Sequence, residues 1–195
     1  MTDTMRSSED WYARDLSGEE FTDVTFSDLD LTEATATGAS FDHCTFKRAS
    51  FNVAAFTDSS FANCTFAHCN FFDAAFTGCR MVGSIFQKCS FNITRIDGGN
   101  WSMVALPGAE LSKAVFNSVR MSEADLRGVK CSGGTFRDVD LGGAWLDGAD
   151  FSGADLRGSN LVSLDPQETN VKKAVVDMQQ AIVLAGNLGL DIRPD

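Results

Sequence analysis

Two His–Cys dipeptides, His43–Cys44 and His68–Cys69, combine residue types that could do chemistry. Imidazole and thiolate groups bind zinc, and a cysteine beside a histidine base can act as a nucleophile. Zinc sites usually also contain closely spaced cysteine pairs, and the sequence has no CxxC pair. Whether the dipeptides can converge depends on the elements that carry them. The remaining cysteines are Cys64, Cys79, Cys89 and Cys131.

The dominant pattern is an apolar residue at every fifth position. From Trp11 to Leu161, 31 consecutive positions spaced by five residues all carry apolar side chains. Of the 16 phenylalanines, only Phe72 lies outside this series. A small residue usually stands two positions earlier, as Ala49 does before Phe51. We call these the large and the small inward positions.

A period of five fits neither an α-helix, with 3.6 residues per turn, nor a continuous strand, with its period of two. Short extended stretches with a corner in each repeat satisfy it, and four repeats then make one square turn of about 20 residues. The three outward positions carry mostly Asp, Asn, Ser, Thr, Arg and Gly, which suit exposed corners. The sequence therefore predicts an all-β, quadrilateral parallel β-helix.

This arrangement separates the residues of the two dipeptides. Cys44 and Cys69 occupy small inward positions, whereas His43 and His68 stand at outward corners. They cannot converge on one ion or build a catalytic Cys–His pair. We expect no metal, no cofactor and no enzymatic activity. Disulfides between cysteines one turn apart, such as Cys44 and Cys64, are the alternative to the packed free thiols that we favour.

Charge limits the classes of partner. The net charge of −11 argues against a nucleic-acid-binding protein, which needs a basic surface, and favours a basic protein partner. Residues 15–165 contain 20 acidic and 11 basic side chains. With about 4.8 Å per turn the rod would be roughly 36 Å long, a length over which duplex DNA carries about 21 charges. Surface carboxylates that only keep the protein soluble are the alternative interpretation.

The sequence predicts three regions: a tail or cap over 1–13, the β-helix over 14–164, and a C-terminal cap with a helix over 165–195. Asp177 as N-cap, with Gln180 at the capping-box position, predicts a short helix over about 178–185 that stops at Gly186. Such a short helix must pack on the last turn, on a second copy of the chain, or on both. No leader or membrane-spanning run is apparent, so we expect a cytoplasmic protein with no membrane partner.

A few apolar residues stand at outward positions. Val53, Phe72 and Ile93 belong to one face in successive turns, and Trp145 is a similar case nearer the C-terminal end. They could form a strip for a protein partner, or they could be accidents of packing.

The segments Ala124–Gly128 (ADLRG), Ala149–Gly153 (ADFSG) and Ala154–Gly158 (ADLRG) resemble the repeats of pentapeptide-repeat proteins. That resemblance implies a right-handed quadrilateral β-helix of about 7–8 coils. The unbroken rod, the Phe-rich middle turns, the Asp165–Pro166 break and the terminal helix are most similar to the MfpA and Qnr group of gyrase-interacting fluoroquinolone-resistance proteins.

This second resemblance implies a homodimer joined at the C-terminal ends, and a DNA mimic that binds DNA gyrase and protects it from fluoroquinolones. The extruded loops of Qnr proteins are missing here. A structural or adaptor rod that binds a non-gyrase protein through a flat or apolar face is the alternative. For gyrase binding we expect Asp28, Asp30, Glu33, Asp138, Asp140, Asp147, Asp150 and Asp155. For dimerisation we expect Ile182, Ala185, Leu188 and Leu190.

Overall fold

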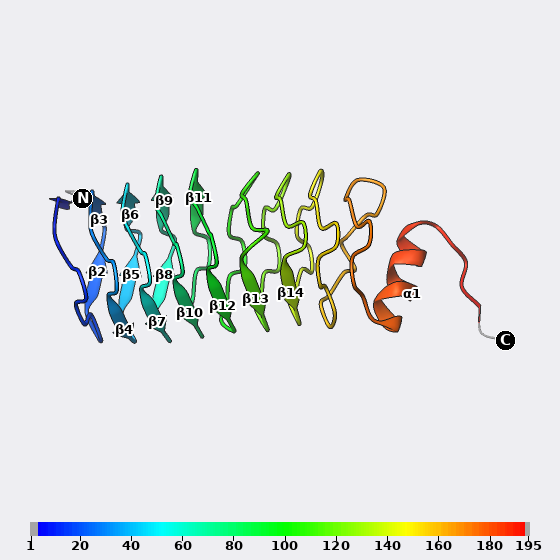
Figure 1. The fold of residues 1–195 in the computed structure, drawn as a ribbon, viewed down its shortest axis with the longest axis horizontal. Helices are drawn as coiled ribbons and strands as arrows, with labels where there is room; N and C mark the ends of the chain where they lie inside the picture. The colour runs from blue at the N-terminus through cyan, green and yellow to red at the C-terminus, as the bar shows by residue number, and fades with distance from the viewer. Residues whose placement is uncertain (1–3, 194–195) are drawn as a thin grey trace.

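The computed structural model describes residues 4–193, which form one rod of stacked turns with α1 at its C-terminal end (Figure 1). Residues 20 apart pair in parallel, so that Phe46 lies between Phe26 and Phe66. The predicted fold class is confirmed: the protein is a β-solenoid of about seven turns with parallel sheets and one short C-terminal helix. The outermost parts of the expected tail and cap, 1–3 and 194–195, lie outside the described residues.

The rod has four faces, numbered in the order in which each turn visits them. The first face contains β1 (Thr4–Ser7), β3 (Val24–Ser27), β6 (Thr45–Lys47), β9 (Thr65–Ala67) and β11 (Ile85–Gln87). The second face is joined by isolated bridges, such as those of Asp30 to Ser50 and Lys130 to Asp150. The third face contains β4 (Thr35–Thr37), β7 (Ala55–Thr57), β10 (Ala75–Thr77), β12 (Arg95–Asp97), β13 (Val115–Asn117) and β14 (Thr135–Arg137). The fourth face contains β2 (Glu20–Thr22), β5 (Ser40–Asp42) and β8 (Ser60–Ala62), and isolated bridges continue it.

The large inward positions fill the centre of the rod. The rings of Phe26, Phe46, Phe66 and Phe86 stack in one column with centroids 5.1, 5.0 and 4.7 Å apart. Stacked rings of this kind are favourable beyond the area that they bury. The series of phenylalanine rings ends at Phe86, because the next ring stacked on it is the larger indole of Trp101. The indole Nε1 of Trp101 is buried and has no hydrogen-bond partner among the described residues.

The small inward positions often carry a hydrogen-bond donor. Ser84 Oγ donates to Phe61 O at 2.5 Å and Thr94 Oγ1 donates to Phe71 O at 2.8 Å, in each case to a carbonyl of the preceding turn. Cysteine thiols make the same contact, at 3.4 Å from Cys64 Sγ to Phe41 O. Cys, Ser and Thr are therefore interchangeable there as small groups that satisfy a buried carbonyl.

The corners explain the glycines. The residue two positions after each large inward residue often has a positive φ, and glycine fills many of these corners, as Gly128 and Gly153 do. Many other corners carry non-glycine residues, most of them polar. Val53 and Ile93 are the exceptions that stand out, with φ of 59° and 54°, because β-branched residues strongly disfavour this region.

The stack extends beyond the expected range of 14–164. β1 pairs with β3, and Trp11 is buried against Phe21 and Phe26, so 4–13 form part of the first turn. At the other end a bridge joins Asp155 to Val175. Beyond it, α1 runs from Met178 to Asn187.

Helix α1 begins as predicted and ends later. Asp177 is the N-cap, and the capping box with Gln180 is formed in both directions. Gly186 lies inside the last helical turn instead of ending it. Gly189 is the residue with positive φ, and Leu190 N–H donates to Ala185 O at 3.1 Å, which makes a Schellman motif. Within residues 4–193 no helix has the length and apolar character needed to cross a membrane.

Candidate partner-binding surface

The eight acidic residues expected to bind a partner do not lie on one face. Asp28 and Asp147 belong to the first face, and Asp140 belongs to the fourth. Asp138 and Asp155 belong to the third face, where they follow or pair with β14. Asp30, Glu33 and Asp150 belong to the second face. The structure therefore distributes them around both ends of the rod, and one flat partner surface could not contact all of them.

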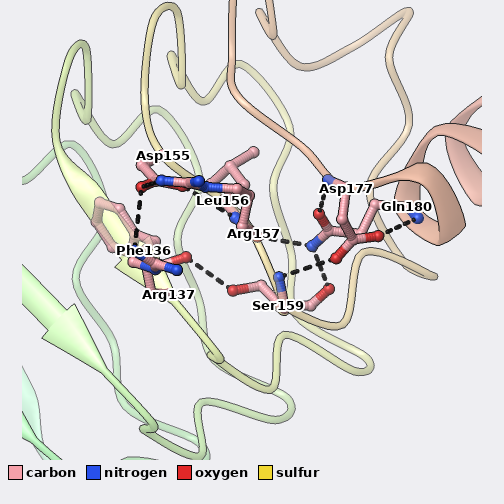
Figure 2. Close-up of polar contacts among 9 residues, drawn as sticks. Phe136, Arg137, Asp155, Leu156, Arg157, Ser159, Asp177 and Gln180 are labelled. Atoms are coloured by element: carbon pink, nitrogen blue, oxygen red, sulfur yellow. Dashed lines mark hydrogen bonds and ion pairs between the residues drawn. The ribbon is translucent and has the colours of Figure 1, made fainter.

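Asp155 is enclosed by two arginines (Figure 2). Arg157 Nε and Nη2 donate to its two carboxylate oxygens at 2.9 and 2.7 Å, and Arg137 Nη1 lies 3.9 Å away. The hydrogen bond from the Arg157 side chain is the main reason that the pKa of Asp155 falls to about 2. The carboxylate is ionised at neutral pH, but its charge is compensated locally.

Two further acidic residues are compensated in the same way. Arg48 donates through Nε and Nη2 to both oxygens of Asp28 at 2.7 Å. Arg127 donates to both oxygens of Asp125 at 2.8 Å. In both cases the side-chain hydrogen bond from arginine lowers the pKa of the aspartate. Exposed pairs of this kind add little to stability, but they reduce the field that a distant partner experiences.

Asp140 and Asp150 accept hydrogen bonds that hold the adjoining backbone and the next turn in place. Asp150 Oδ1 accepts hydrogen bonds from Ser152 N–H and from Asn170 Nδ2, both at 2.9 Å. Asp140 Oδ1 accepts hydrogen bonds from Gly142 N–H at 3.1 Å and from Asn160 Nδ2 at 2.9 Å. Both carboxylates thus fix the turn that follows them and connect it to the next turn of the rod.

The N-terminal acidic residues of the second face surround a tyrosine. A hydrogen bond with Glu33 is the main cause of the raised pKa of Tyr12, and the charge of Asp30 adds to it. Asp30 also accepts a hydrogen bond from Thr32 N–H at 2.9 Å. No salt bridge to Asp30 or Glu33 is formed within residues 4–193, so no arginine or lysine offsets the charge of these two side chains.

Asp138 and Asp147 are the most available of the eight. Both are exposed, and neither carboxylate forms a hydrogen bond or an ion pair with the described part of the chain. Asp147 lies near enough to Arg127 to raise the pKa of that guanidinium slightly, after the larger effect of Asp125. Asp138 stands at a corner with φ of 54°.

The His–Cys dipeptides diverge as the five-residue period predicts. His43 is exposed, with Nδ1 3.0 Å from Asp42 Oδ2, whereas Cys44 is buried. No group of three or more His, Cys, Asp or Glu side chains suited to a metal ion occurs among the described residues. All six cysteines are free. The Cys44 thiol raises the pKa of Cys64, and the Cys89 thiol raises that of Cys69, so Cys64 and Cys69 stay protonated.

The outward apolar residues are exposed. Val53, Phe72 and Ile93 are between 40% and 46% exposed, and Trp145 is 57% exposed. Arg127 lies over the Trp145 ring, 5.2 Å from its centroid. Ile85 and Met103, which were not expected from the sequence, line one groove of about 430 Å³ with Trp145. The signal available for Ile85 was its place three turns before Trp145 on the same face.

The residues expected at a dimer interface lie on the C-terminal end of the rod. Ile182, Leu188 and Leu190 are exposed and Ala185 is half-buried. The opposite side of α1 is anchored to the last turn, as Figure 2 shows. Gln180 Nε2 donates to Leu156 O at 2.6 Å and to Ser159 O at 2.7 Å. Met178 and Ile192 extend the exposed apolar surface.

Comparisons with known proteins agree on the repeats. Residues 116–160 match a family model described as pentapeptide repeats (9 copies), and 20–52 and 49–87 match one described as pentapeptide repeats (8 copies). Two solved structures of QnrB1, a plasmid-mediated fluoroquinolone resistance protein, are similar in fold. The full-length one is 22% identical with a TM-score of 0.64, and the alignment covers 95% of this chain and 100% of that one. A trypsin-treated variant of QnrB1 is 23% identical with a TM-score of 0.57, covering 97% and 98%. No curated protein sequence matches significantly.

Proposed function

Because the chain belongs to the pentapeptide-repeat family and its repeats form a continuous acidic rod, we propose that it binds DNA gyrase in place of DNA and protects the enzyme from fluoroquinolones. The observation that carries the proposal is the combination of an uninterrupted rod with a net charge of −11. The similarity in fold to QnrB1, along the whole length of both chains, supports the choice of target. The protein would act in the cytoplasm and without catalysis.

The magnitude of the charge is sufficient for partial mimicry. Over 15–165 the excess of acidic residues is nine, against about 21 phosphate charges on duplex DNA of the same length. Five of the acidic residues in this range are held by arginine, namely Glu19, Asp28, Asp73, Asp125 and Asp155. Among the eight acidic residues expected to bind a partner, the effective negative surface then lies at the N-terminal Asp30 and Glu33 and the C-terminal Asp138 and Asp147, none of which pairs with an arginine.

Charge reversal at Asp138 and Asp147 tests this surface. Lysine fits the Asp138 corner, because Lys88 and Lys173 have positive φ at equivalent corners. Asp140 should be kept, since it holds its own turn. In a gyrase supercoiling assay with a fluoroquinolone, the Asp138→Lys/Asp147→Lys variant should need at least a tenfold higher concentration to protect the enzyme.

Asp58→Lys is the matched control. Asp58 occupies the same corner of the third face as Asp138, four turns earlier, with φ of 47°. It should protect nearly as well as the unchanged protein. If the double variant protects as well as the control, the acidic surface is not the gyrase-binding surface. If the unchanged protein has no effect on gyrase with or without drug, the proposed function is wrong.

A role as an adaptor for a different protein is the second candidate, and the exposed strip of Val53, Phe72 and Ile93 favours it. The two candidates differ in their response to salt. Binding through uncompensated carboxylates should weaken strongly between low and physiological ionic strength, whereas binding through the apolar strip should not. Phe72→Ser should abolish adaptor binding and leave protection of gyrase unchanged.

We also propose that two copies of the chain associate through the C-terminal end. Ile182 and Ala185 lie on the side of α1 away from Gln180, and Leu188 and Leu190 continue this apolar surface. Pairing would cover these side chains and would produce a rod about twice as long. Light scattering should show a dimer, and Ile182→Glu should give a monomer. A monomeric unchanged protein at tens of micromolar would contradict the proposal.

A further inference from the structure

The ladder of backbone hydrogen bonds on the second face is interrupted between 88–93 of one turn and 108–113 of the next. We call this opening the slot. The bridge series along this face includes Asn70 to Ser90 and Glu110 to Lys130, and the bridge from Ser90 to Glu110 is missing among the described residues. In the turn before, the N–H groups of His68, Phe71 and Asp73 donate to the carbonyls of Gln87, Ser90 and Asn92 at 2.8, 2.9 and 3.0 Å.

The equivalent bonds across the slot are not formed within the described chain. They would run from the N–H groups of Lys88, Phe91 and Ile93 to the carbonyls of Pro107, Glu110 and Ser112, and from Glu110 N–H back to Cys89 O. The backbone donors and acceptors on the two rims of the slot are therefore not paired with each other. The equivalent groups in all earlier turns of this face are paired. Open edges of this kind are templates for another extended chain.

The other three faces remain paired at the same level. Phe86 N–H donates to Ala105 O on the first face, and Val115 N–H donates to Thr94 O on the third, both at 2.9 Å. Trp101 N–H donates to Arg120 O at 2.7 Å on the fourth face. The slot is thus a wedge, closed at the far side of the rod and open on the second face. Figure 1 shows the wider spacing of the turns directly after β11.

Two residues account for the wedge. Pro107 takes the position that Gln87 holds in β11, and it brings no N–H group to the ladder. Half a turn away from Cys89 and Ala109, Gly99 has φ of 87°, and a Cβ atom on it would stand 2.1 Å from Cys79 O, so only glycine fits there. The turns keep their backbone hydrogen bonds at Gly99, where Asn100 N–H donates to Cys79 O at 3.0 Å, and they separate half a turn away, at Cys89 and Ala109. These are small inward positions that are only half-buried.

The opening is large enough to hold a ligand. It contains a cavity of about 390 Å³ and an adjoining one of about 340 Å³, and both are lined by Cys89, Phe91 and Glu110. Residues of both rims contribute, since Lys113 lines the first cavity and Pro107 lines the second. The cavities are open to solvent on the second face.

We propose that the slot binds a short extended segment of another polypeptide, which completes the interrupted ladder. The two rims present N–H and C=O groups with the spacing of a parallel sheet, and a peptide in extended conformation offers both groups in the same order. The straight part of the slot, 89–92, fits about four residues. This proposal does not depend on gyrase being the partner.

The neighbouring side chains define the sequence of the segment. It would lie between Cys89 and Ala109 at one position, and between Phe91 and Leu111 two positions later. The segment therefore needs a small residue followed, after one intervening residue, by an apolar residue. Charges of both signs surround the opening, at Lys88, Glu110 and Lys113, so they do not favour a strongly charged segment.

The test uses the full chain and the synthetic peptide acetyl-Thr-Ala-Asn-Leu-Thr-amide, with hydrogen exchange of backbone amides as the readout. In the free protein, the amides of 88, 91, 93 and 110 should exchange at least tenfold faster than those of 68, 71, 73 and 90. Saturating peptide should slow the slot amides at least tenfold and leave the others unchanged. The same peptide with N-methylated Asn and Leu should have no effect.

Two variants complete the design. Ala109→Met places a longer side chain in the slot and should abolish protection by the peptide. Ala55→Met adds the same side chain at an exposed position of β7, where the ladder is complete, and should leave protection unchanged. The proposal is overturned if the free slot amides are already slow, if the peptide gives no protection, if the N-methylated peptide protects equally, or if Ala109→Met behaves like Ala55→Met.

Discussion

Arg157 binds both carboxylate oxygens of Asp155, with Nε and Nη2 at 2.9 and 2.7 Å. The two residues are two positions apart, so their side chains leave the third face in the same direction. Asp155, which the sequence suggests as a contact for a basic partner, thus already forms an ion pair within its own chain.

The pair predicts how stability responds to acid. The pKa of Asp155 is about 2 in the folded protein, below its ordinary value of 3.8, so its contribution to folding is complete above about pH 4 and is lost as the pH falls toward 2. In urea unfolding at several pH values, Asp155→Asn should lower stability at pH 7 and have little effect near pH 2. Asp147→Asn, which removes a carboxylate without an ion pair, should change stability little at pH 7.

The strained corners predict stabilising substitutions. Val53 and Ile93 have φ of 59° and 54°, a conformation that costs a β-branched residue about 1–3 kcal/mol. Asn63 has φ of 54° at an equivalent corner, so Val53→Asn should raise the free energy of unfolding by about 1 kcal/mol. Chemical denaturation measures the change. Val115→Asn, in the regular strand β13, should lower the free energy of unfolding instead. Equal effects of the two substitutions would argue against backbone strain at Val53.

The aromatic column predicts where the core is most sensitive. Phe66 is fully buried between Phe46 and Phe86, and Phe66→Ala should cost about 3–5 kcal/mol through lost burial and a cavity. Phe66→Leu should cost clearly less, because a leucine such as Leu106 fills the same column further along. Phe72→Ala on the exposed surface should cost less than about 1 kcal/mol. Thermal unfolding followed by circular dichroism distinguishes these three outcomes.

The anchor of α1 predicts local unfolding. Gln180→Leu leaves the carbonyls of Leu156 and Ser159 without their donor, at a cost of about 1–3 kcal/mol, and removes half of the capping box. Amide exchange in α1 should accelerate while exchange in β14 stays unchanged. Gln179→Leu, at an exposed neighbouring position, should leave α1 as protected as before.

The repeat pattern predicts the fold because one inward residue per five constrains every turn in the same way. The sequence alone places Phe46 over Phe26, and it directs Cys44 inward and His43 outward. It does not predict Gly189 as the end of α1, since Gly186 is an equally good signal and only packing against the last turn decides between them. It also does not predict the slot, where Cys89 and Ala109 keep the pattern and only Pro107 and Gly99 differ.

The acidic surface could be predicted less well than the core. Counting charges finds Asp28 and Asp155, but their compensation by Arg48 and Arg157 depends on side-chain geometry. The spacing of 20 residues between Asp28 and Arg48 places them one above the other once the turn length is known. Asp138 remains available because the corners one turn away carry Ser118 and Gly158. Asp147 remains available because Arg127, one turn before it, binds Asp125 instead.

The parallel stacking of residues 20 apart also restricts how the length of this rod can change. Loss or gain of one five-residue repeat would shift every later outward side chain by a quarter turn, so that Asp138 and Asp147 would move to neighbouring faces while the core stayed filled. Only the loss or gain of four repeats together would keep the C-terminal surface in line with the N-terminal one. The fold thus tolerates the duplication of a single repeat. Each such duplication would, however, rotate the C-terminal surface relative to the N-terminal one, and a partner that contacts both ends would no longer fit.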